Sequence, residues 1–488
     1  MKNQKNTSKT TVSVALIWKL LERFGVQGIQ FVLQIVLARI LDPDHYGTLS
    51  MMIIFINLAN IFIQTGFNTA LVQNKDVTEE DYSSVFCVST LVAMLLYIVI
   101  FVAAPFVGAF YEMSDIVMPL RVIALVLIPG ALNSIQLAKA SRELNFRVVF
   151  TSNIVAIIIS GVVGIIIALN GGGLWALVAQ TMLNTTIASV VMLFTVAWKP
   201  RLVCNFKRVK VLFSFGWKLL VSGLLDTLYQ DVHSLIVGKK YDSSTLGFYN
   251  RGKQFPQFIV SAVNSSVQSV LLPVMSEKQD STDYVKNITK RSVQLTSYIV
   301  FPIMAGLAGV ASSLIELLLT EKWLPCVPYM QICCIIFAFY PVYSCNLYAI
   351  NAIGRSDVFL KLEIIKKLFG IVLLAIAVFC FDTPLAIVWT GVISIPFDLF
   401  INSMPNRKLI RYSYLEQMKD ILPPLVASAA MCFLVLCVDK LGLGCFPTLL
   451  IQLVVGVVAY LTISVLFQMQ AYVFVVNIVK NQLRREKK

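Results

Sequence analysis

The sequence predicts an all-α membrane protein of about fourteen transmembrane helices, in two similar six-helix lobes followed by two extra helices. Its composition, the recurrence of apolar runs and an internal repeat predict this fold. Of the 488 residues, 58% are hydrophobic and only 14% are charged, and the mean hydropathy is +0.79. Because a soluble domain carries about 25% charged residues, this composition excludes a soluble enzyme.

Apolar runs follow one another along the whole chain, and each is long enough to cross about 30 Å of hydrocarbon as a helix. The loops between them are short and leave no room for an external catalytic domain. The predicted spans are 13–40, 48–72, 83–110, 116–138, 148–169, 173–198, 211–237, 255–275, 290–319, 326–349, 359–381, 384–404, 421–438 and 446–470.

These spans divide the chain into five parts. The first residues are polar, and the segment after them is too long and too charged for a signal peptide. The expected parts are a cytoplasmic tail (1–12), an N-lobe of helices 1–6 (13–198), a C-lobe of helices 7–12 (211–404), two extra helices (421–470) and a basic cytoplasmic tail (471–488).

Basic residues gather in alternate loops. The predicted inner loops and the C-terminal tail are rich in Lys and Arg, whereas the outer loops hold few, among them Arg251 and Lys322. By the positive-inside rule we expect both termini in the cytoplasm and the protein in the cell (inner) membrane. Basic loops beside a membrane account for most of the net charge of +14, so no nucleic-acid partner is expected.

The ten cysteines do not indicate a metal site. Most of them lie inside apolar runs, where cysteine behaves as a small hydrophobic residue, and the chain has only two histidines. We therefore expect no metal and no cofactor. A disulfide between Cys326 and Cys445, both near the predicted outer face, stays open.

The two halves of the chain repeat each other at a shift of about 200 residues. The positions matched at this shift are Trp18–Leu21 with Trp217–Leu220, Asp42 with Asp242, and Gly47 with Gly247. Further along, Pro129 in the fourth span matches Pro341 in the tenth. An even number of spans per half gives both halves the same orientation, so the predicted pseudo-twofold axis runs along the membrane normal.

Four of the predicted spans carry polar residues along one face. At 100° per residue, each set lies on one side of a helix. The sets are Lys19, Arg23, Gln27, Gln30 and Gln34 in the first span; Asn57, Asn60, Gln64 and Asn68 in the second; Lys218, Ser222, Asp226, Tyr229 and His233 in the seventh; and Gln257, Asn264 and Gln268 in the eighth.

Such groups are costly in lipid and must face protein or a water-filled cavity. For each amide and hydroxyl, hydrogen bonding to a neighbouring helix and lining of a cavity both stay open. The cations Lys19, Arg23 and Lys218 need a counter-charge or an anionic ligand. Glu22 and Asp226 are either those counter-charges or, together with His233, candidate ion-coupling groups.

The chemistry of these faces fits a large hydrated anion. Amides and hydroxyls match the hydroxyls of sugars, and Lys and Arg match phosphate. The sequence has no HExxH, phosphate-loop or GxSxG motif, so no catalytic residue is predicted.

Several short motifs then indicate a family. They are Leu37–Leu41 followed by Tyr46 and Gly47, Val72–Lys75 with Thr78–Asp81, Ser141–Arg147, Leu246–Arg251, and Gly354–Asp357 with Lys361. In combination they resemble the bacterial polysaccharide flippases (Wzx-type), within the multidrug/oligosaccharidyl-lipid/polysaccharide exporter superfamily. The resemblance covers residues 12 to 420 and is greatest to the branch that exports colanic-acid-like and lipopolysaccharide (O-antigen-type) repeat units.

The resemblance implies a MATE-like fold in which two lobes form a V and open alternately to each side. It implies a polyprenyl-pyrophosphate-linked oligosaccharide as substrate, carried from the inner to the outer leaflet under an ion gradient. A polysaccharide polymerase and a chain-length regulator are the candidate partner proteins. The positions that fit pyrophosphate binding are Lys19, Arg23 and Lys218; since Ser222 matches Arg23, the charge differs between the lobes.

Two other readings stay open. A lipid II flippase or a cation-coupled multidrug exporter would share the fold, although a drug exporter would have a more apolar and more acidic cavity. An integral-membrane glycosyltransferase or polymerase belongs to another class and would need a sizeable external loop with catalytic groups.

Overall fold

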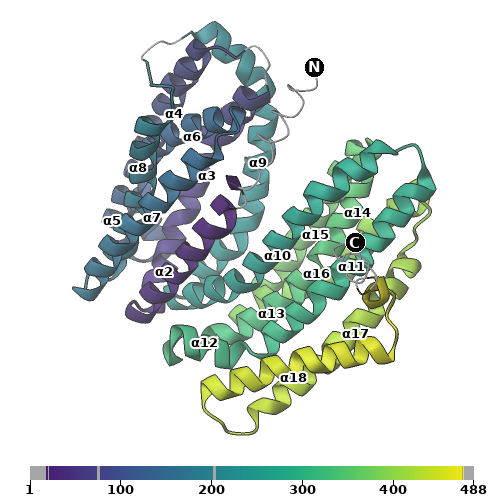
Figure 1. Ribbon diagram of the computed structural model, residues 1–488. Helices are drawn as coiled ribbons and strands as arrows, with labels where there is room; N and C mark the ends of the chain where they lie inside the picture. The colour runs from purple at the N-terminus through teal and green to yellow at the C-terminus, as the bar shows by residue number, and fades with distance from the viewer. Residues whose placement is uncertain (1–17, 20, 74–76, 202–204, 475, 477–488) are drawn as a thin grey trace, which may run out of the picture. The chain divides into compact units, whose positions relative to one another are not determined.

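The computed structural model describes residues 18–19, 21–73, 77–201, 205–474 and 476 of the chain (Figure 1). All regular elements in these residues are helices, which confirms the all-α fold class. The chain forms two compact units, Met1–Gly247 and Phe248–Lys488, and each is described by itself.

The first unit begins with a π-helical turn, η1. Its elements are η1 (Glu22–Val26), α2 (Gln27–Ile40), α3 (Pro43–Gln73), α4 (Glu79–Tyr111), η2 (Ser114–Ile116), α5 (Val117–Ile123), η3 (Ala124–Val126), α6 (Leu127–Arg142), α7 (Phe146–Leu169), α8 (Leu174–Thr195) and α9 (Phe206–Lys240), with the start of α10 (Ser243–Glu277). Within it α7 packs on α8, α3 on α9, and α6 on α3 and α4.

The second unit holds the rest of α10 and the C-terminal helices. Its further elements are α11 (Thr282–Gly309), α12 (Ala311–Leu319), η4 (Glu321–Cys326), α13 (Val327–Ala338), α14 (Tyr340–Ala352), α15 (Ser356–Cys380), α16 (Pro384–Leu409), α17 (Tyr414–Asp439) and α18 (Cys445–Leu466). The two extra helices of the sequence analysis are α17 and α18, and α17 packs along α11 (Figure 1).

Eleven helical segments of the described chain are long and apolar enough to cross a membrane, and they coincide with eleven of the fourteen predicted spans. The other three predicted spans are 13–40, whose first residues lie outside the described ones, 211–237 in α9, and 359–381 in α15. α9 and α15 are long enough, with 35 and 25 residues, but they carry more charge. The count of fourteen therefore stays a prediction.

Helix ends follow local sequence signals. Thr78 caps α4 and Ser413 caps α17, each in a reciprocal capping box with an acidic residue three positions on. Predicted loop 238–254 is largely helical: α9 ends at Lys240 and α10 begins at Ser243. Arg251 therefore lies inside α10, where it is buried with its guanidinium 5.1 Å from the ring of Trp323, and not in an outer loop.

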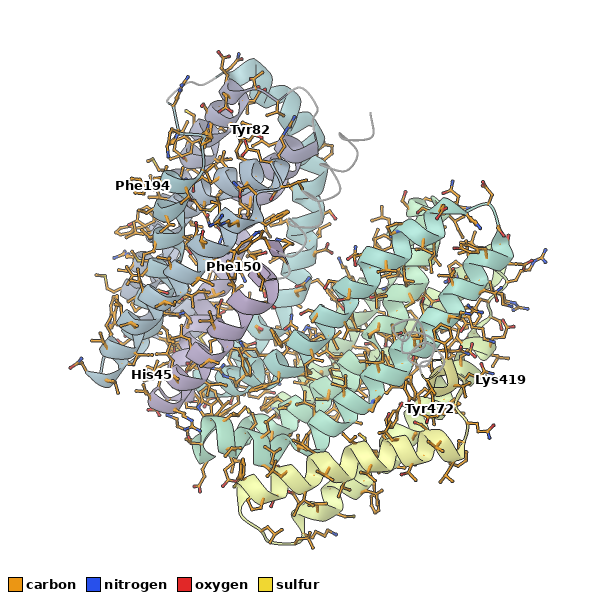
Figure 2. All side chains as sticks on the ribbon, in the orientation of Figure 1. His45, Tyr82, Phe150, Phe194, Lys419 and Tyr472 are labelled. Carbon is orange, nitrogen blue, oxygen red and sulfur yellow. The ribbon has the colours of Figure 1, made fainter. Side chains whose placement is uncertain are left out.

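Each unit has a hydrophobic core between its helices. In the first unit one part of this core lies around Tyr82, Val85 and Trp198, where the rings of Tyr82 and Trp198 lie 6.2 Å apart (Figure 2). In the second unit a core joins α11, α17 and α18, and Tyr460 of α18 donates a hydrogen bond of 2.8 Å to the carbonyl of Tyr298. The extra helices are thus packed into the second unit.

Two glycines at matching repeat positions allow a close approach of α3 and the start of α10. A Cβ atom on Gly47 would lie 1.6 Å from the carbonyl oxygen of Ser243, and one on Gly247 would lie 2.2 Å from the carbonyl oxygen of Pro43. Gly47 thus meets Ser243, four positions before Gly247, and Gly247 meets Pro43, four positions before Gly47. A twofold axis produces reciprocal contacts of this kind. A hydrogen bond between Ser243 and Asp44 joins the same two turns.

The compact units divide the chain at Gly247, whereas the predicted lobes divide between 198 and 211. Packing of α9 along α3 places the seventh predicted span in the first unit. The lobe boundaries stay a prediction. All described cysteines, Cys326 and Cys445 among them, are free thiols.

Candidate functional site

Lys19 lies beside the start of α7. Its Nζ atom is 2.8 Å from Oε2 of Glu22 and 5.0 Å from the ring centroid of Phe146, the first residue of α7. The rings of Trp18 and Phe150 lie 5.5 Å apart and hold this segment against α7 (Figure 2). Lys19 therefore lies level with the first turn of α7, which is a candidate span.

The ion pair of Lys19 leaves part of the cation free to meet a ligand. The Lys19 side chain is 47% exposed, whereas that of Glu22 is 19% exposed. A surface pair of this kind contributes little, about 0–1 kcal/mol, so an anion with more than one negative charge can displace Glu22. Glu22 is thus ion-paired with Lys19, and its role as a counter-charge or as an ion-coupling group stays a prediction.

Further along this face the glutamines are accessible. Gln27 is exposed, and Gln30 and Gln34 are half-buried. In α3, Asn57 and Gln64 are exposed and Asn60 is half-buried; Gln64 donates a hydrogen bond of 3.4 Å to Oδ1 of Asn60. Polar groups that reach the surface of an apolar helix must meet water or a polar ligand.

α9 brings a second polar face against α3. Asn57 Nδ2 lies 3.5 Å from Oδ2 of Asp231, so the second and seventh predicted spans meet through polar side chains. Ser222 and Asp226 are exposed, and Tyr229 and His233 are half-buried.

Asp231 is a site residue that the sequence analysis missed. It lies about 140° around the helix from Asp226 at 100° per residue, and therefore off the stripe that was used as the signal. Its pairing with α3 is set by helix packing, which periodicity does not report.

The polar face of α10 lies in the second unit. Gln257 and Gln268 are exposed, and Asn264 accepts a hydrogen bond of 3.3 Å from the hydroxyl of Tyr348 in α14. Asn264 therefore bonds to a neighbouring helix, which is one of the two roles left open for each amide. Gln257 and Gln268 stay accessible.

Three predicted site residues lie outside what the structure describes. They are Arg23, Asn68 and Lys218, whose side chains have no described position. The structure thus describes one of the three predicted pyrophosphate-binding cations, Lys19.

The described chain has many apolar helices of membrane-spanning length, and several of them carry exposed amides and hydroxyls. These features define a multi-pass membrane protein. Residues 36–328, more than half of the chain, match the family described as polysaccharide biosynthesis protein. The chain belongs to this family.

Curated relatives from three bacteria agree with this membership. The chain is 22% identical to the teichuronic acid biosynthesis protein TuaB of Bacillus subtilis (strain 168), over 76% of this chain and 77% of that protein. It is 24% identical to the succinoglycan biosynthesis transport protein ExoT of Rhizobium meliloti (strain 1021), over 64% of this chain and 63% of that protein. It is 21% identical to the lipopolysaccharide biosynthesis protein WzxC of Escherichia coli (strain K12), over 72% and 71%.

Solved structures show the same fold. The lipid II flippase MurJ, in an inward closed conformation, superposes with a TM-score of 0.73 at 16% identity, over 93% of this chain and 98% of that chain. An inward-facing multidrug resistance MATE family transporter of the MOP superfamily superposes with a TM-score of 0.59 at 13% identity, over 85% and 100%. The predicted MATE-like helical fold is thereby confirmed.

Proposed function

We propose that this protein flips a polyprenyl-pyrophosphate-linked oligosaccharide from the inner to the outer leaflet of the cell membrane, for polysaccharide or lipopolysaccharide biosynthesis. Membership of the polysaccharide biosynthesis family supports this function, as do relatives named for teichuronic acid, succinoglycan and lipopolysaccharide. The substrate leaves the protein covalently unchanged, so no catalytic residue is required.

The observation that carries the proposal is the position of Lys19. The pyrophosphate of a lipid-linked sugar lies at the depth of the lipid headgroups, and Lys19 lies level with the first residue of α7, at a helix end. Its half-exposed ammonium and its displaceable partner Glu22 suit a doubly charged phosphate group. Arg23 and Lys218 are proposed to complete the phosphate site.

The exposed amides are proposed to receive the sugars. Gln27, Asn57, Gln64, Gln257 and Gln268 offer both donors and acceptors at the surface of apolar helices. Sugar hydroxyls need both, whereas the mostly apolar substrates of a drug exporter do not. The amide-rich faces therefore favour an oligosaccharide over a drug.

Orientation and coupling belong to the same proposal. The loop before α7 and the C-terminal tail are basic, so we place both termini in the cytoplasm and the Lys19 end at the inner leaflet. The passage between the lobes opens alternately to each side of the membrane, and an ion gradient drives this alternation. Asp226 and His233 are the candidate coupling groups. A polysaccharide polymerase and a chain-length regulator are the proposed partners that use the flipped product.

Deletion of the gene tests the function. We expect a lipid-linked glycan to accumulate in the inner leaflet and surface polysaccharide to be lost. In the deletion strain, a gene with Arg23→Ala and Lys218→Ala should insert normally but restore no polysaccharide. Lys408→Ala, at an exposed helix end, is the matched control and should restore it fully; normal export by the double variant would refute the phosphate assignment.

A further inference from the structure

A ladder of four polar residues runs along α16, which is otherwise a membrane-spanning apolar helix. Ser394, Asp398, Asn402 and Asn406, called here the α16 ladder, recur at intervals of four residues. Residues at this spacing are neighbours on one helix face. None of the polar faces described above includes them.

One end of the ladder is closed by a buried amide cluster. Asn406 Nδ2 donates to Oδ1 of Asn346 in α14 at 2.7 Å, and Asn346 exchanges two hydrogen bonds of 2.9 and 3.0 Å with Gln417 of α17. All three side chains are at most 1% exposed. This end is tightly bonded between three helices.

The next position along the ladder is not bonded in this way. Asn402 is 0% exposed, and among the described residues neither its Nδ2 nor its Oδ1 has a hydrogen-bond partner. In the same described set, Oδ1 of Asn406 and the hydroxyl of Tyr343 are buried without partners. A buried polar group is costly if no hydrogen-bond partner meets it. Asn402 and Asn406 are neighbours on one face of α16, and the charge of Asp398 acts on Tyr343. Unpaired donors and acceptors of this kind call for small hydrogen-bonding molecules, as in buried water sites.

Asp398 lies beside these groups with an unbalanced charge. Lys366 and Glu363 of α15 are the charges that act on its carboxyl group, and Ser394 lies within hydrogen-bonding reach of it. Lys366 is already paired with Glu363 at 2.5 Å. The three groups together hold two carboxylates and one ammonium, which leaves one negative charge without a fixed partner.

This charge lies at membrane depth. Lys366 is ten residues from the start of α15, and Asp398 is eleven residues from the end of α16. At 1.5 Å per residue, both lie about 15 Å from the same end of the helix pair. An uncompensated charge at this depth is costly, so a mobile positive charge is needed there.

We propose that Asp398 binds and releases a proton at membrane depth, and that Asn402, Asn406 and Tyr343 hold the water molecules that bring it. A hydronium ion at the ladder gives its proton to a carboxylate oxygen of Asp398, an O–H bond forms, and a water molecule is left. The charge of the three groups then changes from minus one to zero. The inference rests on the proposed flippase function and makes this site a coupling site in the second unit.

The surroundings of Asp398 are consistent with a single exchangeable proton. α15 contributes Lys366 and Glu363, and α14 contributes Tyr343, on which Asp398 acts electrostatically. α13 carries no charged residue. On α17, Glu416 and Asp420 are engaged by Lys286 and Lys290 of α11.

Carbodiimide labelling of the purified full-length protein tests the site without any substrate. The reagent dicyclohexylcarbodiimide forms a stable adduct with protonated carboxyl groups in apolar surroundings, and mass spectrometry locates it. We expect labelling of Asp398 to fall about tenfold for each pH unit on the alkaline side of its midpoint. In Lys366→Met, labelling should extend to higher pH, since the cation that favours the carboxylate is lost.

Lys367→Met is the matched control, because Lys367 lies about 100° around α15 from Lys366 and should leave the midpoint unchanged. Asn402→Leu should slow labelling, since the water position is filled. Labelling that is independent of pH, or equal midpoints in the two lysine variants, would overturn the proposal. Protection by Na⁺ at constant pH would also overturn it and would indicate a sodium site.

Transport distinguishes this inference from the proposed function. In vesicles, Asp398→Asn should flip the lipid-linked oligosaccharide at the same rate with and without a pH gradient, whereas the wild type should respond to the gradient. If the wild type flips no lipid-linked oligosaccharide but labelling follows pH as expected, the function fails and the proton site stands. If flipping is observed and the Asp398→Asn variant still responds to the gradient, the proton site fails.

Discussion

Replacement of Gly47 by Ala tests the close contact between α3 and the start of α10. The added Cβ atom would lie 1.6 Å from a backbone oxygen, and ordinary contact begins at 3.4 Å, so the helical turns must separate by roughly 1.8 Å. A backbone oxygen cannot turn away as a side chain does. Overpacking of this kind typically costs about 1–3 kcal/mol, which lies within the usual range of destabilising single substitutions.

Gly28→Ala is the control, because Gly28 also lies in a helix and a Cβ there meets nothing within 4 Å. Both substitutions gain the same helix propensity, about 0.5–1 kcal/mol, so the difference between the two variants isolates the cost of the contact. Unfolding in mixed SDS micelles measures it, and we expect Gly47→Ala to unfold about 1–3 kcal/mol more easily than Gly28→Ala.

The reciprocal contact at Gly247 gives a second prediction. Gly247→Ala, whose Cβ would lie 2.2 Å from the carbonyl oxygen of Pro43, should be destabilising in the same way. Since either alanine separates the same two turns, the double variant should cost less than the sum of the single ones. Strict additivity, or equal stability of Gly47→Ala and Gly28→Ala, would refute the contact.

Three further substitutions give measurable outcomes. Gln417→Leu removes one of the two side-chain partners that Asn346 has in the buried amide cluster, and should lower the free energy of unfolding by about 1–3 kcal/mol in the same SDS titration. Tyr460→Phe removes one hydrogen bond between α18 and α11 and should cost roughly 0.6 kcal/mol, the average for such bonds between membrane helices; a larger loss would mean that the hydroxyl has another role. The hydrogen bond from Lys239 lowers the pKa of Glu112 from 4.5, so this pair stabilises the fold above that pH and loses its effect as pH falls below it. Thermal unfolding of Glu112→Gln should therefore differ from wild type at pH 7 and converge with it in acid, and a difference that grows in acid would contradict the pairing.

The sequence by itself determined the helical class, eleven segments of membrane-spanning length and the exposed positions of Gln27, Asn57 and Gln257. These are local properties: an apolar run fixes its own hydrogen bonds as a helix, and the period of 3.6 residues places Gln27 and Gln34 on one side. The repeat likewise pointed to Gly47 and Gly247, although it could not show that each glycine meets the other half of the pair.

Only the tertiary structure decided how these helices use their polar groups. It placed Lys19 level with the start of α7, paired Asn57 with Asp231, and continued α9 and α10 through a predicted loop. It also separated the bonded amide of Asn406 from the unbonded one of Asn402, which are identical in sequence terms. Such contacts join residues far apart in the chain, and the packing of neighbouring helices determines them. Periodicity and composition therefore do not predict them.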